Sequence, residues 1–513
     1  MAKTDAKRTV AGIMSHPAVT ATADETVSAA ADRMRAQGVG SVVVVDGDRP
    51  VGILTERDLV RLAAANADSG ALVADWMTPD PDHVAPDAEV SNAFARLAER
   101  GYRHIPVVDD GRLVGIVSMR DLMRIAQIQP AESLAHEIPR GLEGVVVAET
   151  NIGDVRGLEG FYHYRQYNAV ELAETRTIED VWYLLFHGEL PTLAQRRVFL
   201  DEVRPLREIS PAVKEVLPEL ARVAGSAAPL DLLRTTISLL GASLGFRPSL
   251  DLSASELRSQ ALRVCAVVPT LLCALHRLQH DEPIVDPDPQ LPYAANYLTM
   301  MLGEVPTAEH ARAVEQYLIS TIDHGFNAST FTARVITSTG ADLAAAVVGA
   351  IGALSGPLHG GAPSRALQML DEIGTIDNAD QWIRGAVGRG DRLMGFGHRV
   401  YKTDDPRSVM LRSVAERLGG PKLEFAERVE QLAVEILAEL KPGRKLYTNV
   451  EFYAGIVMDA CGVPRDMFTP TFASSRVIGW TAHILEQAAD NRLIRPGAHY
   501  AGPPPPQPVP PAE

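Results

Sequence analysis

Residues 394–407 read Met-Gly-Phe-Gly-His-Arg-Val-Tyr-Lys-Thr-Asp-Asp-Pro-Arg, a histidine beside glycines that is followed by Asp-Pro-Arg. Glycines let the backbone approach a bound molecule, and a histidine in a break between helices can offer it a ring nitrogen. Three more clusters combine His, Gly or Asn: Asp323-His324-Gly325-Phe326-Asn327-Ala328-Ser329, Gly356-Pro357-Leu358-His359-Gly360-Gly361-Ala362 and Thr448-Asn449-Val450-Glu451-Phe452-Tyr453. Helix packing does not need such clusters, so together they predict a functional site.

The segments between these clusters have the spacing of helices. From Thr177 to Arg495 the apolar residues recur every three or four positions, as in Val429, Leu432 and Ile436. This part is therefore predicted to be almost all helix. The uncharged stretch 343–364 is rich in Ala and Gly, which favours a closely packed internal helix and a functional loop over a membrane span.

The N-terminal part contains an internal repeat, because residues 14–62 align without a gap with residues 77–125 at an offset of 63. Gly-Ile-Leu-Thr-Glu-Arg-Asp at 52–58 recurs as Gly-Ile-Val-Ser-Met-Arg-Asp at 115–121. Each copy has the pattern of helix, strand, turn, strand and helix. Two copies predict one α+β module with pseudo-twofold symmetry over residues 1–128.

The remaining boundaries follow from proline content. Residues 129–140 hold two prolines without clear periodicity, which predicts a linker to a helical core at 141–502. Residues 503–513 are mostly proline and are predicted to be an extended, disordered tail.

Composition limits the function classes. The 513 residues are enough for about three compact units, and the net charge of −16 disfavours binding to nucleic acid or to an anionic membrane surface. Three cysteines in so long a chain, with no secretory pattern at the N-terminus, indicate a reducing compartment, so we expect a cytoplasmic protein. No metal site is predicted, because no histidine was found in a paired spacing with Cys or a carboxylate.

Residues 10–128 resemble the tandem cystathionine-β-synthase (CBS) domain, on the motifs at 52–58 and 115–121. The resemblance implies an adenine nucleotide as effector, with its ribose bound by Thr55, Asp58, Ser118 and Asp121. A Thr or Ser that begins a helix leaves backbone amides facing an anion, which suits a nucleotide. The alternative stays open that these residues only cap their helices.

Residues 141–496 resemble citrate synthases, including the 2-methylcitrate synthases. The resemblance rests on the four clusters and on Gly-Leu-Glu-Gly-Val (141–145), Leu-Leu-Phe-His-Gly-Glu-Leu-Pro-Thr (184–192) and Phe-Ala-Ser-Ser-Arg-Val-Ile-Gly-Trp (472–480). It implies a mainly α-helical fold with a large domain and a small mobile domain, here about 363–467, and a homodimer or higher homo-oligomer. The expected fold class is thus a tandem CBS module followed by a citrate-synthase fold.

The family joins the methyl carbon of acetyl-CoA to the ketone of oxaloacetate and then hydrolyses the thioester. The resemblance assigns His359 as donor to the thioester carbonyl, His398 as the residue that polarises the ketone, and Glu451 as the general base. The family usually has Asp at the last position. The extra methylene of Glu displaces the carboxylate, and a misplacement of ~1 Å can cost ~10²-fold in rate unless the backbone compensates.

The resemblance also assigns the substrate contacts. Arg407, Arg476 and Arg495 are expected to bind the two carboxylates of oxaloacetate, with Arg495 supplied across the dimer. His324 is a further substrate contact, and Thr321 stands where the family often has a second histidine. Met394, Gly395, Phe396 and Gly397 are expected to lie against CoA. No cofactor is required beyond the CoA thioester, which is a substrate.

Three functions remain open on this evidence. The first is a citrate synthase with a nucleotide-sensing module, and the second is a 2-methylcitrate synthase that uses propionyl-CoA. The third is a catalytically impaired nucleotide sensor. Glu451 and Thr321 favour the third, whereas both histidines and all three arginines argue against it.

Overall fold

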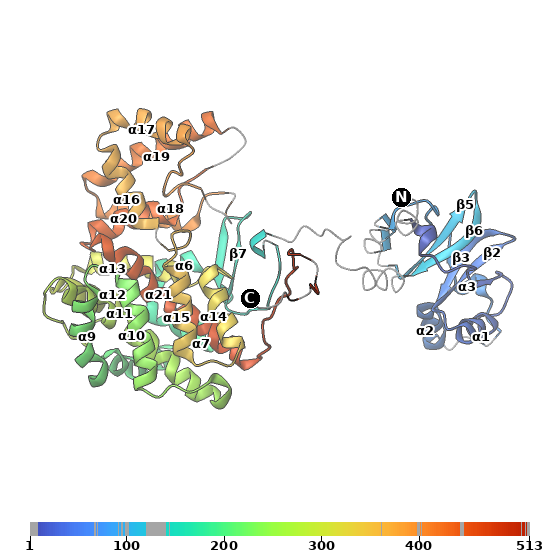
Figure 1. The fold of residues 1–513 in the computed structure, drawn as a ribbon, viewed down its shortest axis with the longest axis horizontal. Helices are drawn as coiled ribbons and strands as arrows, with labels where there is room; N and C mark the ends of the chain where they lie inside the picture. The colour runs from blue at the N-terminus through green and yellow to red at the C-terminus, as the bar shows by residue number, and fades with distance from the viewer. Residues whose placement is uncertain are drawn as a thin grey trace. The chain divides into compact units, whose positions relative to one another are not determined.

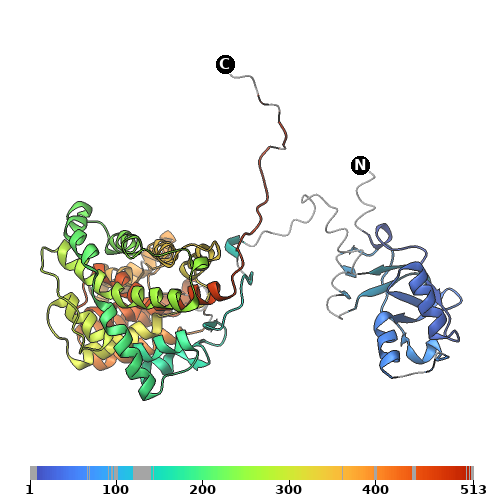
Figure 2. The same cartoon turned by 90° about the horizontal axis from the view of Figure 1, so that it is seen from below.

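The computed structural model describes residues 9–65, 68, 70–90, 92–93, 96–97, 102–118, 140–142, 144–360, 362–397, 401, 403–441, 446–503, 505–507 and 509. The chain forms two compact units, one of Met1–Val145 with Ala498–Glu513 and one of Val146–Gly497 (Figures 1 and 2). The predicted linker at 129–140 lies outside the described residues except for Arg140. The described residues of the proline-rich tail form neither helix nor strand.

The N-terminal unit is built from short strands and helices, coloured blue in Figure 1. Its elements are η2 (Val10–Gly12), β1 (Thr20–Ala21), α1 (Val27–Gln37), β2 (Ser41–Asp46), β3 (Arg49–Thr55), α2 (Glu56–Ala64), α3 (Val73–Trp76), β4 (Thr78–Pro79), β5 (His104–Asp109) and β6 (Arg112–Ser118). The strand order is β1-β2-β3-β4 in one sheet and β5-β6 in the other.

The two hairpins of this unit confirm the internal repeat. Ser41 pairs with Thr55 in the β2–β3 hairpin, and His104 pairs with Ser118 in the β5–β6 hairpin, each 63 positions later. Both ladders also shift register at the same place, between Val44 and Val45 in one copy and between the equivalent valines in the other. The second helix of the second copy, which would carry Asp121, lies outside the described residues.

The larger unit begins with a small antiparallel sheet of β7 (Gly153–Arg156), β8 (Phe161–Tyr164) and β9 (Tyr167–Asn168). Helices make up most of the rest, which confirms the prediction from periodicity. They are α6 (Ala169–Thr175), α7 (Ile178–His187), α8 (Leu193–Val203), α9 (Pro211–Ala224), α10 (Pro229–Ser243), α11 (Ala254–Gln279), α12 (Tyr293–Leu302), α13 (Ala308–Thr321), α14 (Ala328–Ser338), α15 (Leu343–Leu354), α16 (Ala362–Ile373), α17 (Ile376–Arg389), α18 (Pro406–Leu418), α19 (Pro421–Leu440), α20 (Val450–Ala460) and α21 (Phe468–Ala489). Three short 3₁₀ turns accompany them among the described residues of this unit: η4 (Arg204–Arg207), η5 (Ser249–Asp251) and η6 (Arg465–Met467), while η3 (Arg140–Leu142) precedes the unit in the sequence.

Local sequence sets where these helices begin. Ser253 and Glu256 bond each other's backbone amides at the start of α11, and Asp342 accepts from the amide of Ala345 at the start of α15. By length and composition, α11 could cross a membrane, but 89% of its most apolar window is buried inside this unit, as in the core helix of a globular protein. The predicted internal helix of residues 343–364 is confirmed as α15, which ends before the His359 loop.

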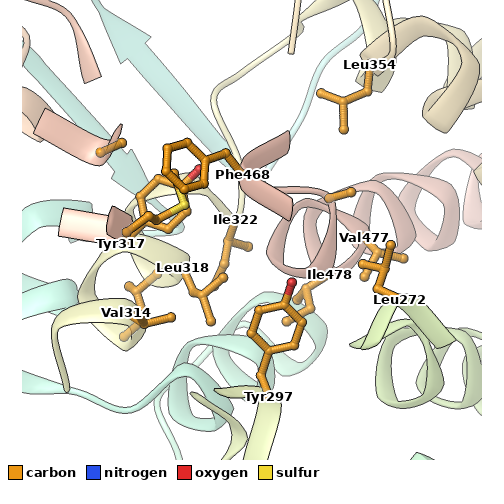
Figure 3. Close-up of a cluster of buried hydrophobic side chains, with 14 of the residues drawn as sticks. Leu272, Tyr297, Val314, Tyr317, Leu318, Ile322, Leu354, Phe468, Val477 and Ile478 are labelled. Atoms are coloured by element: carbon orange, nitrogen blue, oxygen red, sulfur yellow. The ribbon is translucent and has the colours of Figure 1, made fainter. Parts of the chain in front are cut away.

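One hydrophobic core runs through the helices of this unit. Figure 3 shows a central part of it, where side chains of α13 such as Tyr317 and Leu318 meet Phe468 and Ile478 of α21. Burial of apolar side chains contributes ~25 cal/mol per Å², so α21 is held firmly along its length. Site residues carried by α21 therefore have a rigid support.

Helices α16 to α20 pack on one another, with α18 and α16 on α20 and α17 on α19 (Figure 1). These helices cover most of residues 363–467, the range expected for the small domain. Contacts of α13 with α18 and α20, and of α16 with α21, join them to the other helices. The site described next lies along these contacts.

Candidate active site

The four sequence clusters occupy helix ends in the larger unit. His324 lies between α13 and α14, His359 between α15 and α16, and residues 394–397 follow α17. Arg407 and Glu451 stand in the first turns of α18 and α20. Backbone amides at helix starts are not used within the helix, and at α18 and α20 the side chains of Asp405 and Asn449 accept from them.

Asp405 ties two of these helix starts together. Its carboxylate accepts from Nε and Nη2 of Arg407, at 3.0 and 2.8 Å, in a buried bidentate pair. Oδ2 of the same carboxylate accepts from the amide of Val450 at 3.1 Å. Asp405 thus holds the start of α20 beside Arg407, which places Glu451 within reach of the Arg407 charge. Burial opposes the charge on Arg407, but Asp405 raises its pKa overall.

Glu451 has the properties of a general base. The side chain of Asn449 caps α20 and accepts from the amide of Glu451 at 3.0 Å. Burial raises the pKa of the Glu451 carboxyl to about 7, with Arg407 opposing the shift and Asp405 adding to it. A carboxylate with this pKa is more basic than an exposed one and is still ionised in a large fraction of molecules at neutral pH.

This pKa predicts the pH dependence of the reaction. Proton abstraction needs the ionised carboxylate, so kcat/KM should rise with pH through about 7 and then level off. Burial lowers the pKa of His359 to about 4, so His359 stays neutral across this range and adds no second limb. The measurement is a steady-state rate profile between about pH 6 and pH 9. A flat profile through pH 7 would contradict the assignment of Glu451.

The predicted CoA loop lies against the start of α20. The carbonyl of Gly395 accepts from the amide of Asn449 at 2.9 Å, and the carbonyl of Gly397 accepts from Nδ2 of Asn449 at 3.0 Å. Gly395 has a φ of +84°, and a Cβ added there would stand 2.9 Å from the ring of Phe452. Only glycine fits this close approach, which brings Met394–Gly397 next to the start of α20, where Glu451 stands.

His359 is held as a neutral hydrogen-bond donor. Its Nε2 accepts from the backbone amide of Ser329 at 3.3 Å and lies 2.8 Å from Oγ of Ser329. Since a backbone amide can only donate, Nε2 carries the lone pair and the proton sits on Nδ1. Trp480 donates to the same Oγ at 3.0 Å, which fixes the serine. Burial and then the charge of Arg476 lower the pKa of His359 to about 4, so Nδ1–H is present at neutral pH.

Arg476 is a buried cation in the middle of α21. Its Nε donates to the carbonyl of Thr321 at 2.7 Å, and its guanidinium lies 4.4 Å from the centre of the Phe472 ring. Burial lowers its pKa to about 10, and Arg407 contributes to the same shift, so Arg476 keeps its charge at neutral pH. Arg407 and Arg476 are two buried cations that repel each other. A ligand with two negative charges would relieve this repulsion and could pair with both guanidinium groups.

His324 completes the group. Its Nε2 lies 3.0 Å from the hydroxyl of Tyr401, and its ring packs on Tyr162 with centroids 5.7 Å apart. The guanidinium of Arg407 lies over the same two tyrosine rings, 5.8 to 5.9 Å from their centres. The tyrosines therefore join His324 to Arg407. The hydroxyl of Thr321, the residue that the resemblance places where the family often has a second histidine, lies 2.9 Å from Oγ of Ser475.

The predicted site residues separate into three groups. The structure brings together His324, His359, Arg407, Glu451, Arg476 and the 394–397 loop. Arg495 is exposed in the segment after α21. His398 lies outside the described residues, as does Asp121. Asp405, Ser329, Tyr162 and Tyr401 were not among the predicted site residues, although all but Tyr162 stand within the quoted clusters.

The CBS residues can be described at one of the two copies. Asp58 is buried, and its Oδ2 accepts from the amide and the hydroxyl of Thr55, at 3.0 and 2.8 Å. Arg61 donates to the other oxygen at 3.1 Å. The capping role that the sequence left open is therefore present at Thr55 and Asp58. Ser118 is the last residue of β6.

Known proteins of similar sequence match both the N-terminal repeat and the helical core. A sequence model described as citrate synthase, C-terminal domain, matches residues 141–497, and one described as CBS domain matches residues 10–65 and 73–127. The citrate synthase of Haloferax volcanii is 40% identical over 371 residues, which cover 72% of this chain and 97% of that protein. The 2-methylcitrate synthase of Mycobacterium tuberculosis is 40% identical over 366 residues, which cover 71% and 91%.

A solved structure gives the same result for the fold. The ternary complex of carboxymethyl coenzyme A and oxaloacetate with the citrate synthase of Thermoplasma acidophilum matches with a TM-score of 0.67 and 30% identity, over 73% of this chain and 98% of that one. The predicted fold class and enzyme type are thereby confirmed. The chain belongs to the citrate synthase family and carries a pair of CBS domains ahead of the synthase core.

Proposed function

We propose that this enzyme condenses acetyl-CoA with oxaloacetate to give citrate and CoA. The observation that carries the proposal is the grouping of side chains around two buried arginines. The neutral His359 lies within reach of the Arg476 charge, the Glu451 carboxyl, whose pKa is raised, lies within reach of the Arg407 charge, and the two arginines interact with each other. The Thermoplasma acidophilum relative was solved with oxaloacetate and a CoA derivative, which supports the same substrates here.

The steps follow from the roles of these side chains. The Glu451 carboxylate takes a proton from the acetyl methyl group, and the C–H electron pair moves toward the thioester oxygen. Nδ1–H of His359 donates to that oxygen as its negative charge grows, which lowers the barrier. The methyl carbon then attacks the ketone carbon of oxaloacetate, and the ketone oxygen gains a proton. His398 is proposed for this last role from the family resemblance alone. Water finally cleaves the citryl thioester and releases CoA.

Arg407 and Arg476 are proposed to hold the two carboxylates of oxaloacetate. Guanidinium groups suit carboxylates because they offer two parallel N–H donors. Both are buried and rigidly supported, by Asp405 in one case and by the Thr321 carbonyl in the other. Such a preformed clamp fixes the ketone relative to Glu451, and correct placement of reactants is a large part of the rate.

The acyl group remains to be distinguished, because relatives named citrate synthase and 2-methylcitrate synthase are both 40% identical to this chain. A single methylene in a pocket changes binding by only ~1 to 3 kcal/mol. We expect kcat/KM to be larger for acetyl-CoA than for propionyl-CoA. The measurement is free-thiol release with saturating oxaloacetate and each thioester in turn. A larger kcat/KM for propionyl-CoA would make the protein a 2-methylcitrate synthase.

The oligomeric state is proposed from the family resemblance and from the exposure of Arg495. We infer a homodimer, or a higher homo-oligomer, in which the exposed Arg495 enters the active site of the neighbouring protomer. Light scattering of the purified full chain measures the mass, and a monomer would exclude this role.

The location is proposed from the state of the cysteines. Cys265, Cys273 and Cys461 are all free and buried, which agrees with a reducing compartment such as the cytoplasm.

The CBS pair is proposed to bind an adenine nucleotide and to change the rate of the synthase. The expected result is saturable binding to the full chain of at least one of ATP, ADP, AMP, NADH or S-adenosylmethionine, measured by calorimetry. A typical coupling free energy of ~1 to 3 kcal/mol between the nucleotide and a substrate would change the affinity for that substrate by about 5- to 150-fold. Asp58→Asn keeps an oxygen to cap α2 but removes a charge, so it should weaken binding.

Asp32→Asn is the matched control, because Asp32 is an exposed carboxylate on α1 of the same unit. Absence of binding by all five ligands would leave the pair as an assembly module. Binding with no synthase activity under any condition would instead support the nucleotide sensor.

A further inference from the structure

A second group of ligand side chains lies at the C-terminal end of α11, apart from the residues described above. His276 and His280 are one helical turn apart at the end of that helix, and Asp466 comes from η6, between α20 and α21. One ligand atom from each of the three side chains lies within 4.8 Å of the other two. The sequence pattern did not reveal this group, because Asp466 is far along the chain from the two histidines.

The contact between His276 and Asp466 has the spacing of two ligands of one ion. Nδ1 of the buried His276 lies 3.3 Å from Oδ2 of Asp466 and has no other polar partner within the described part of the chain. Two ligand atoms bound about 2.0 to 2.1 Å from a tetrahedral zinc ion are about 3.3 to 3.4 Å apart. The buried nitrogen and the carboxylate oxygen therefore already stand at the required separation.

His280 is prepared for the same role by its backbone contact. Its Nδ1 lies 2.8 Å from the carbonyl oxygen of His276, which can only accept, so the proton of a neutral His280 sits on Nδ1. The lone pair is then on Nε2. A histidine ligand that donates its other N–H to a backbone carbonyl is the usual arrangement around a bound metal, because the contact fixes both tautomer and ring orientation.

The surroundings leave the group open to an ion from solution. His280 and Asp466 are exposed, whereas His276 is buried beneath them. The neighbouring cation, Arg465, is paired with Asp371 of α16. The cysteines, which would compete for a soft metal, are all buried. Two imidazoles and one carboxylate suit zinc and similar first-row ions, and three protein ligands leave one position for water.

We propose that His276, His280 and Asp466 form a binding site for a divalent first-row transition-metal ion, with Zn²⁺ as the probe. The bound ion would fasten η6 to the end of α11. Because η6 leads directly into α21 and Arg465 pairs with α16, the ion would hold the point where the α16–α20 helices rejoin the rest of the unit. Binding to the folded state alone stabilises that state, so Zn²⁺ should raise the melting temperature.

The test uses the full chain, treated with chelator, desalted and titrated with Zn²⁺ by calorimetry. We expect one Zn²⁺ per chain and a rise in Tm. His280→Ala and Asp466→Asn should each weaken the binding tenfold or more and remove the rise in Tm. Both side chains are exposed, so neither change should unfold the protein. His499→Ala is the matched control, because His499 is exposed and outside the group.

Three results would overturn the proposal. Failure of the wild-type chain to bind Zn²⁺ would do so, as would binding that is unchanged in both His280→Ala and Asp466→Asn. Loss of binding in His499→Ala would place the ion elsewhere and would also contradict it. Synthase activity without added metal should be the same in all four proteins, because none of these residues contacts the proposed substrates.

Discussion

Glu451→Gln is expected to lower kcat by about 10²- to 10⁴-fold, the range typical for loss of a general base. Glutamine has nearly the same shape as glutamate but cannot accept the methyl proton. Arg407, Asp405 and the Asn449 cap remain in place, so the dissociation constant of oxaloacetate should change little. Stopped-flow or steady-state thiol release gives kcat, and calorimetry with oxaloacetate alone gives the dissociation constant.

The matched control is Glu424→Gln, the same chemical change at an exposed glutamate on α19. It should have wild-type kcat. If Glu451→Gln retained wild-type turnover, Glu451 would not be the base. If it lost oxaloacetate binding as completely as turnover, Glu451 would have a binding role instead.

His359→Ala is expected to lower kcat by about 10²- to 10³-fold, the cost of removing one donor from a developing oxyanion. The effect should fall on kcat more than on the KM for oxaloacetate, since Nδ1–H is proposed to act on the thioester. Ser329→Ala should have a smaller effect. It removes the hydroxyl beside Nε2 but leaves the backbone amide that fixes the tautomer.

His499→Ala, at an exposed position, is the control for His359→Ala and should leave both constants unchanged. A His359→Ala enzyme that differed only in the KM for oxaloacetate would show that His359 binds that substrate. A Ser329→Ala enzyme as slow as His359→Ala would show that the hydroxyl, rather than the amide, holds the imidazole.

Much of the fold could be predicted from local patterns. The repeat at an offset of 63 predicted two equivalent hairpins, and their registers and irregularities agree strand by strand. Helical periodicity likewise predicted the helical core. These features depend on residues close together in the sequence, where spacing and structure are directly linked. The boundaries of the small domain depend on how separate helices pack, and they stay a prediction.

The candidate site was predicted in part, for reasons that differ between residues. Glycine-flanked histidines and the Asp-Pro-Arg turn are visible in the sequence. The structure places His359 and Arg407 in the same group of side chains, since both interact with Arg476. The bond from Asp405 to the amide of Val450 joins segments far apart in the chain, so no local pattern reveals it. The same is true of Tyr162, which reaches His324 from β8. The proposed role of Arg495 involves a second protomer.

The Asp405 contact bears on the proposed use of a glutamate where the family usually has aspartate. Asp405 holds the start of α20 through Val450, so the backbone position of Glu451 is set by a buried, charge-assisted contact. A backbone held in this way can compensate for the longer side chain. The raised pKa then follows mainly from burial, with the carboxylate of Asp405 adding to it.

The most direct test of the proposed reaction is to identify its product. The full chain would be incubated with oxaloacetate and acetyl-CoA that carries ¹³C in the methyl group, and the mixture would be analysed by NMR. We expect one citrate, with the label in a methylene carbon, for each CoA released, and formation of both about 10²-fold or more slower with the Glu451→Gln enzyme. Release of CoA with labelled acetate and no citrate, or no reaction with these substrates, would contradict the proposal.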